Sequence, residues 1–338
     1  MAHELETQNG VASFASFREH AWHNLGTVFD TEKNTSEMLV AANLNNWNVR
    51  LEDLEIPSNL VSDKSYQYVV RTNPTDKTQT DVLGIVGERY VPLQNEDLFS
   101  FGDNILDGGG RWETAGSIRG GRVVFGSLAL ERETVLDPNG VADVVKTYLL
   151  INTSHDGSIA IQASITPVRV VCANTLNVAL NRTKKKDGVK QSFKIRHTQT
   201  AEGKIAIARQ ALGMANAYMT EFDIMAHAMI AKEISAQDFN NIILAAYPKP
   251  ELDTKGAVKK WENKVDMIND IYTGEYNGMI SGNAWGAFNA LTERLDWYRT
   301  SRSANGESMF AAASGFDPAT NAEKNRLLSI VQNTLQIV

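Results

Sequence analysis

Two glycine-containing turns, each flanked by stretches rich in apolar and β-branched residues, most constrain how this chain can fold. The first is Arg119-Gly120-Gly121, and the second is Thr153-Ser154-His155-Asp156-Gly157, with Asp-Gly at its tip. Glycine adopts the positive φ that tight hairpin turns require, so each turn predicts a β-hairpin. The predicted strand pairs are residues 112–118 with 122–130, and residues 146–152 with 158–165. They predict an antiparallel or mixed sheet.

The stretches around the hairpins add strands before them and a helix after them. Residues 66–71 and 82–86 are β-branched or aromatic, which is typical of strands. Residues 94–106 place Leu98, Phe101 and Ile105 at helical spacing. After the second hairpin, the compact stretch Val170–Leu180 predicts a buried helix.

From Thr200 onward, apolar residues recur at helical spacing. Ser235-Ala236-Gln237-Asp238 is typical of a helix N-terminus, and Pro248 and Pro250 end the helix that follows. Further helices are predicted at residues 256–272, 283–298 and 320–337. The fold class is therefore α+β: an antiparallel or mixed sheet with packed helices in the N-terminal half, and a helical C-terminal half. We expect three regions: an acidic N-terminal segment (residues 1–60), an α+β domain with a basic groove (61–198) and a helical domain (199–338).

Signatures of catalysis are mostly missing from the sequence. It contains no Gly-x-x-x-x-Gly-Lys-Ser/Thr phosphate loop and no Gly-x-Ser-x-Gly nucleophile elbow. His20 and His23 lack a third metal ligand nearby. The single cysteine, Cys172, lies in an apolar stretch, which is more typical of a small buried residue than of a nucleophile paired with His155 or His197. Carboxylates are plentiful but share no motif. We therefore expect no enzymatic activity, no cofactor and no metal.

Location and membrane contact follow from the same sequence. A single cysteine excludes an internal disulfide framework and fits a reducing cytoplasm. No apolar run approaches the roughly 20 residues that span a bilayer, and the N-terminus lacks the apolar core of a secretory signal. We expect a cytoplasmic protein that does not enter a membrane.

The charge is distributed unevenly along the chain. The net charge is −7, yet residues 165–211 carry ten basic and two acidic residues, a net of +8. Residues 1–60 carry a net of −6. A basic island in an acidic protein indicates a site for a polyanion more strongly than a mildly basic average would. For Lys184–Lys186 alone, a solvated loop explains the charge equally well.

The candidate phosphate-binding residues lie on the first hairpin and around the basic island. They are Arg111, Arg119, Arg122, Arg169, Arg182, Lys184, Lys185, Lys186, Lys190, Lys194 and Arg196. Lysine and arginine neutralise phosphates with little demand on geometry, and exposed aromatic rings can stack on bases. Trp112 and Phe193 are the candidates for stacking, although a core position is the more common role of each.

Three blocks of sequence resemble an uncharacterised phage/plasmid-like family that is common in actinobacterial phages. The blocks are Tyr148–Gly157 with Thr166–Leu176, Arg196-His197-Thr198, and Asn283–Glu293. The resemblance extends from about His20 to the C-terminus, but it implies no established activity and no catalytic residues. The chain departs from the family at Arg294-Leu295-Asp296-Trp297, where we associate the family with a Tyr/Leu-Asp-His ending.

Two hairpins, a following helix and a basic groove also resemble, in architecture alone, the core of single-strand annealing proteins such as the RecT and Redβ groups and the eukaryotic recombination annealases. That resemblance implies binding of single-stranded DNA and assembly into rings or filaments. We therefore expect a phage-derived, non-catalytic protein that binds and anneals single-stranded DNA in recombination as a homo-oligomer. The alternatives are a phage structural or assembly protein and, third, an unrecognised nucleic-acid-modifying enzyme.

Overall fold

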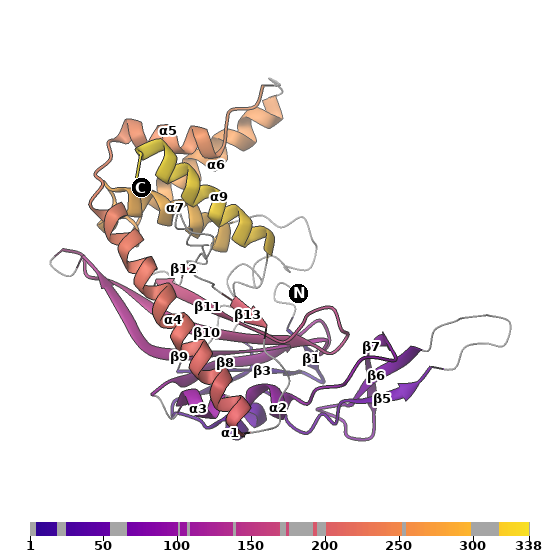
Figure 1. The fold of residues 1–338 in the computed structure, drawn as a ribbon. Helices are drawn as coiled ribbons and strands as arrows, with labels where there is room; N and C mark the ends of the chain where they lie inside the picture. Colours follow the sequence, from indigo (N-terminus) through magenta and orange to yellow (C-terminus); the bar gives the residue numbers. More distant parts are fainter. Residues whose placement is uncertain are drawn as a thin grey trace.

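The computed structural model describes residues 5–18, 25–54, 66–100, 102–106, 109–137, 140–169, 174–175, 192–194, 201–251, 255–298 and 318–337. These residues form sheets that are mostly N-terminal and helices that are mostly C-terminal, which confirms the predicted α+β class (Figure 1). One hydrophobic core contains residues as far apart as Ala15 and Leu335.

The main sheet has eight strands and is antiparallel except for one parallel pair. Its strand order is β12-β11-β10-β9-β8-β3-β4, and β13 also pairs with β11. The parallel pair is β3 with β4. Its strands are β3 (Phe14–Phe17), β4 (Thr27–Phe29), β8 (Arg111–Ile118), β9 (Val123–Leu136), β10 (Asp143–Ser154), β11 (Gln162–Arg169), β12 (Asn174–Thr175) and β13 (Ser192–Lys194). The acidic N-terminal segment thus contributes two strands to the sheet that also holds the hairpins.

Both predicted hairpins are confirmed. β8 pairs with β9 across the first turn, where Arg119, Gly120 and Gly121 all have positive φ. β10 pairs with β11 across the second turn, where Gly157 has a φ of 76°, although β11 begins at Gln162 and not at residue 158 as predicted. The turn chemistry that the sequence displays therefore helps to set the register of β8 with β9 and of β10 with β11.

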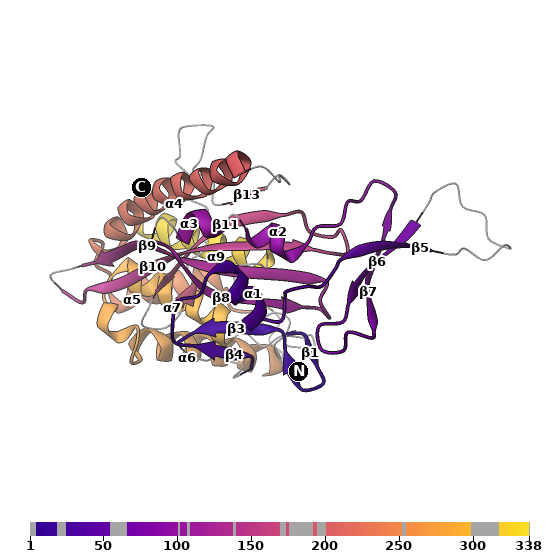
Figure 2. The same ribbon diagram turned by 90° about the horizontal axis from the view of Figure 1, so that it is seen from below.

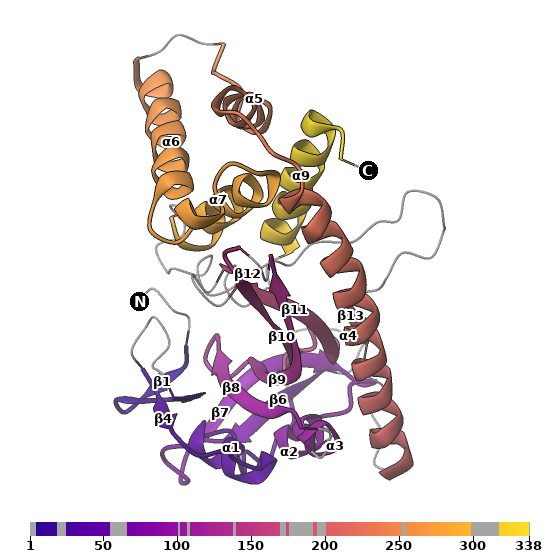
Figure 3. The same ribbon diagram turned by 90° about the vertical axis from the view of Figure 1, so that its left-hand side faces the viewer.

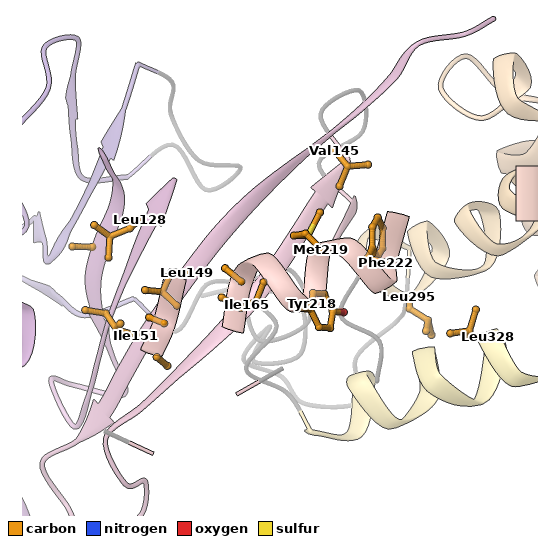
Figure 4. Packing of buried hydrophobic residues seen from close by; sticks show 14 of the residues in the cluster. Leu128, Val145, Leu149, Ile151, Ile165, Tyr218, Met219, Phe222, Leu295 and Leu328 are labelled. Atoms are coloured by element: carbon orange, nitrogen blue, oxygen red, sulfur yellow. The ribbon is translucent and has the colours of Figure 1, made fainter. Parts of the chain in front are cut away.

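One face of the main sheet is apolar and is covered by helices. Trp112, Leu128, Leu149 and Ile165 stand side by side on four neighbouring strands and are buried. The helices that contact strands β3 and β8 to β11 are α1 (Thr35–Ala41), α3 (Gly102–Leu106) and α4 (Ala201–Ile230), and α2 (Asn95–Phe99) packs beside α1. The later helix α7 (Ala284–Trp297) contacts β12. Figure 4 shows the strand residues facing Tyr218 and Met219 of α4. The predicted helix at residues 94–106 is present as the two short helices α2 and α3.

A smaller three-stranded sheet extends to one side of the main sheet (Figure 2). It contains β5 (Arg50–Asp53), β6 (Tyr66–Thr72) and β7 (Thr80–Gly87), all antiparallel. The strands predicted at residues 66–71 and 82–86 are confirmed as β6 and β7. A further pair, β1 (Thr7–Gln8) with β2 (Val11–Ala12), forms a separate two-stranded ribbon.

The C-terminal helices form a group that α4 connects to the sheet (Figure 3). They are α5 (Ala236–Ala246), α6 (Lys255–Thr273), η1 (Gly278–Ile280), α7 (Ala284–Trp297) and α9 (Pro318–Leu335). The N-terminus predicted at Ser235 is confirmed, because Ser235 and Asp238 form a reciprocal capping box. α7 is buried along almost its whole length between α6, α9 and α4.

The helix predicted at Val170–Leu180 is wrong at Asn174 and Thr175. These two residues form β12, which pairs antiparallel with Val168 and Arg169 of β11. The free edge of β11 offers backbone hydrogen bonds, and pairing with that edge overrides the local helical pattern. The rest of the predicted helix lies outside the described residues.

Candidate nucleic-acid interface

Two short strands, β12 and β13, pair with the same edge of β11, and both belong to the basic island in the sequence. β12 and β13 both run antiparallel to β11 along the same edge: Thr175 pairs with Val168, and Ser192 pairs with Ser164. Val168 and Ser164 are four positions apart on β11, about 13 Å at ~3.3 Å per residue. Residues 176–191, which we call the basic insertion, join β12 to β13 in the sequence.

Most of the predicted phosphate-binding residues belong to the basic insertion or follow it. Those that lie outside the described residues are Arg182, Lys184, Lys185, Lys186, Lys190 and Arg196. Two more have strand positions: Arg169 is the last residue of β11, and Lys194 is the last residue of β13. Arg169 precedes the basic insertion in the sequence and Lys194 follows it. Pairing within the sheet fixes the backbone of both residues.

Arg119 and Arg122 lie at the end of the sheet where β13 also ends. Lys194 pairs with Gln162, Gln162 with Asn152, and Asn152 with Phe125, which lies two residues into β9. Three strand spacings separate β13 from β9, about 14 Å. The structure thus places this turn at the Lys194 end of the sheet, beyond the stretch of β11 from Val168 to Ser164 that the two ends of the basic insertion flank.

The turn that carries Arg122 is held to the second hairpin. The backbone N–H of His155 donates to the Arg122 carbonyl over 2.7 Å. Burial alone would raise the pKa of Asp156, but hydrogen bonds from Ser158 and the charge of Arg122 hold it below its usual value. Part of the Arg122 charge is therefore balanced by an ionised neighbour.

Arg111 is three strands from the basic insertion but level with it: Arg111 pairs with Ala129, Ala129 with Tyr148, and Tyr148 with Thr166 of β11. It starts β8, at the far end of that strand from Arg119, and its Nε lies 3.6 Å from Glu113 Oε2. Its guanidinium also lies 5.4 Å from the ring centroid of Phe17. Burial, followed by the charge of Glu113, raises the pKa of Tyr148 nearby. Since Glu113 accompanies it, Arg111 adds little net positive charge to the interface.

The base-stacking role predicted for Trp112 is wrong, because its ring is in the core. The side chain is 1% exposed, its indole N–H donates to Thr35 Oγ1 over 3.0 Å, and its centroid lies 5.1 Å from that of Phe99. A ring covered on its faces cannot stack on a base. Phe193 has a position in β13, and its ring lies outside the described side chains.

The other described residues offer little support for a metal site, for phosphate binding in the cleft between α6 and α7, or for a membrane-spanning helix. No group of three His, Cys, Asp or Glu side chains that could hold a metal ion is found among them. A cleft of about 580 Å³ between α6 and α7 is lined by Asp266, Asp270, Glu275 and Glu293, whose charge would repel a phosphate. None of the described helices has both the length and the apolar character needed to cross a membrane.

Sequence reasoning missed a group of cations around Tyr247 in the helical group. Lys264, Arg294 and Arg326 come from three helices and lie within 6 Å of its ring centroid. About thirty residues separate each cation from the next along the chain, so no local run of charge marks them. Only the packing of the helices brings them together.

The comparisons with known proteins agree with an uncharacterised family. No curated protein and no solved structure matches the chain. A family model described as "Domain of unknown function (DUF932)" matches residues 82–314, which include both hairpins, the basic insertion and α4 to α7. Because the match covers more than half of the chain, the protein belongs to the DUF932 family.

Proposed function

We propose that this protein binds single-stranded DNA through the basic insertion at the edge of its main sheet, and that it promotes annealing without catalysing a reaction. One observation carries the proposal: the chain's concentration of positive charge lies between two segments, β12 and β13, that pair with the same strand. The remaining residues carry a net charge of −15 outside residues 165–211. A polyanion would be attracted to this edge and repelled by much of the rest.

The residue types of the basic island favour binding that does not depend on base sequence. Lysine and arginine side chains contact phosphates without reading bases, so the bases of a bound strand stay available for pairing. Arg119 and Arg122 extend the positive surface toward the hairpin turn. Each contact is weak, and a ring or filament of copies would multiply the contacts along one strand. The architectural resemblance to single-strand annealing proteins supports a role in recombination, and we propose that the protein acts there in the bacterial cytoplasm.

The test is an electrophoretic shift with single- and double-stranded oligonucleotides across a salt series. Replacing Lys184, Lys185 and Lys186 with alanine should weaken single-strand binding and reduce the slope of log affinity against log salt. Each lost phosphate contact changes that slope by about 0.7, so the triple variant should lose up to about two units. The effect should hardly depend on base sequence.

A matched control removes three lysines from elsewhere on the surface. Lys232, Lys255 and Lys259 are exposed and lie in or beside the helical group. Their replacement with alanine changes the net charge by the same amount, so it should leave the salt slope unchanged if the insertion is the binding site. If both triple variants lost the same DNA affinity, the effect would depend on total charge and not on the basic insertion. That result would contradict the proposal.

Two further outcomes identify the alternatives. A structural or assembly protein would self-associate without nucleic acid and show no salt-sensitive DNA binding. A nuclease would require a divalent metal and release fragments. Light scattering with and without a long oligonucleotide, together with gel analysis of the oligonucleotide after incubation with Mg²⁺, distinguishes both from annealing.

A further inference from the structure

Three cationic side chains from three different helices surround the ring of Tyr247, at the end of α5. Lys264 Nζ of α6 lies 4.7 Å from the ring centroid. The Cζ atoms of Arg294 on α7 and Arg326 on α9 lie 5.4 Å and 5.8 Å from it. We call these four residues the Tyr247 cluster. Figure 3 shows the helices α5, α6, α7 and α9 that bring them together.

The Tyr247 cluster carries more positive charge than its neighbours neutralise. Within the described part of the chain, the carboxylate that pairs with it is Glu323, whose two oxygens accept from Nε and Nη2 of Arg326 over 2.7 Å each. Three cations and one carboxylate leave a net charge of about +2. Burial lowers the pKa of Lys264, the charges of Arg294 and Arg326 add to this effect, and the charge of Glu323 opposes it.

Donors in the Tyr247 cluster remain unused. The Arg294 Nε is buried and has no hydrogen-bond partner among the described residues, and the Tyr247 hydroxyl, which interacts with the Arg294 side chain, has no acceptor for its own proton there. Arg326 uses Nη2 to donate to the carbonyl of Ala246 over 3.1 Å, which caps α5. Its Nη1 has no such partner within the described ranges. Buried donors are almost always satisfied in folded proteins, so an acceptor is expected here.

Structural roles explain only part of this arrangement. Arg326 caps α5, and Arg294 in the last turn of α7 complements the helix dipole. Neither role accounts for Lys264, whose ammonium is drawn out of water beside two like charges. The Arg326 side chain is 43% exposed, so the cluster is open to solvent at that residue.

We propose that the Tyr247 cluster binds a phosphoryl group, with Arg294 and Arg326 donating to its oxygens, Lys264 supplying charge and the Tyr247 hydroxyl donating the remaining hydrogen bond. A tetrahedral dianion matches the excess charge, and its oxygens accept from several donors at once. This site shares no residue with the basic insertion. It goes beyond DNA binding at the sheet edge and stands whether or not that proposal holds.

The test is isothermal titration calorimetry of the full chain with inorganic phosphate, at constant ionic strength balanced with chloride. Saturable binding is expected. Lys264→Gln should lower the affinity about tenfold or more, because it removes a charged partner. Lys264→Arg should retain most of the affinity. Because Lys264 is only half-buried, these two variants change the site with little demand on folding, and Tyr247→Phe tests the hydroxyl separately.

Two controls separate this site from other cations. Lys255→Gln removes an exposed charge from the same helix and should leave phosphate affinity unchanged. The alanine triple variant of Lys184–Lys186 should bind phosphate like the unchanged protein, whatever its effect on DNA. Loss of phosphate binding in that triple variant, with no change in Lys264→Gln, would overturn the proposal, as would the lack of saturable binding.

A second titration identifies the source of the phosphoryl group. Adenosine 5′-monophosphate and adenosine are compared with inorganic phosphate. Tighter binding of the monophosphate, with none of adenosine, indicates that a nucleotide occupies the site. Equal affinity of the monophosphate and inorganic phosphate indicates that the phosphoryl group alone is recognised. Binding of adenosine and the monophosphate with equal affinity would contradict a phosphoryl site.

Discussion

The guanidinium of Arg71 and the carboxylate of Glu6 form an ion pair that is buried from solvent. Arg71 Nη1 donates to Glu6 Oε2 over 3.0 Å, and Arg71 Nη2 contacts Glu6 Oε1. Arg71 Nε donates to Asp81 Oδ2 over 3.0 Å, and the guanidinium lies 3.9 Å from the ring centroid of Trp47. This pair fastens the N-terminal segment to β6 of the smaller sheet.

Breaking that pair should destabilise the protein strongly. Arg71→Ala leaves the Glu6 carboxylate buried without its partner, so we expect a loss of about 3–5 kcal/mol in the free energy of unfolding, measured by urea denaturation. The matched control is Arg50→Ala, which breaks a partly exposed pair with Glu52 and should cost less than about 1 kcal/mol. Similar losses for the two variants would show that burial does not govern the pair's contribution.

Two adjacent glycines in the first hairpin should respond differently to alanine. Gly120 and Gly121 both have positive φ, which costs an alanine about 1–2 kcal/mol. A Cβ on Gly120 would meet open space, whereas one on Gly121 would overlap the buried Arg71 guanidinium. Gly121→Ala should therefore lower the midpoint of urea denaturation clearly more than Gly120→Ala. An equal effect would mean that Arg71 can move aside without cost.

His155 should make the protein less stable as the pH falls below about 6.5. Burial, helped by the charge of Arg71 and opposed by Asp156, lowers its pKa to about 4. Between these pH values the unfolded chain binds a proton that the folded chain does not, so stability is full above about 6.5 and falls toward pH 4. The expected loss is about 3 kcal/mol.

The measurement is the free energy of unfolding in urea at several pH values between 4 and 7, for the unchanged protein and for His155→Gln. Carboxylates also titrate at the acidic end of this range, but they contribute to both proteins alike. The difference between the two curves isolates the histidine. Parallel curves would mean that His155 takes up a proton as readily in the folded protein as in the unfolded chain.

The pair of Asp296 and Lys324 joins α7 to α9 inside the helical group. Lys324 Nζ lies 2.6 Å from Asp296 Oδ1, and both side chains are fully buried. Burial lowers the pKa of Lys324, and the charge of Asp296 opposes this shift. Lys324→Met should cost about 3–5 kcal/mol, because Asp296 then stays buried without its cation.

Replacing both members of the pair should recover much of that loss. Asp296→Leu combined with Lys324→Met removes both charges and fills a similar volume with apolar atoms. A double-mutant cycle on unfolding free energies measures the coupling between them. If the two single losses simply add, the charges act independently, and the ion pair does not hold α7 and α9 together.

Local turn and capping signals made much of the fold predictable. Arg119-Gly120-Gly121 and Asp156-Gly157 each determine a hairpin through backbone conformation alone, and Ser235 with Asp238 marks the start of α5. These features depend on residues within a few positions of one another. Sequence patterns read such short-range effects well.

The elements that could not be predicted depend on pairing between distant parts of the chain. Phe14–Phe17 is buried on every residue and lacks the alternation of a typical strand, and it pairs with β8 about a hundred positions later. The same holds for Asn174 and Thr175, whose strand exists only because β11 has a free edge. Trp112 has the composition of a stacking residue, and only the positions of Thr35 and Phe99 bury it.

The geometry of the main sheet does not depend on how many residues the basic insertion contains. Since β12 and β13 are each held by their own pairing with β11, a change in length between Thr175 and Ser192 should leave both pairings in register. Doubling the length of a flexible loop costs only about 0.6 kcal/mol of closure entropy. The basic insertion is therefore a position at which sequence changes in length should be tolerated. A peptide tag inserted there should leave the fold unchanged.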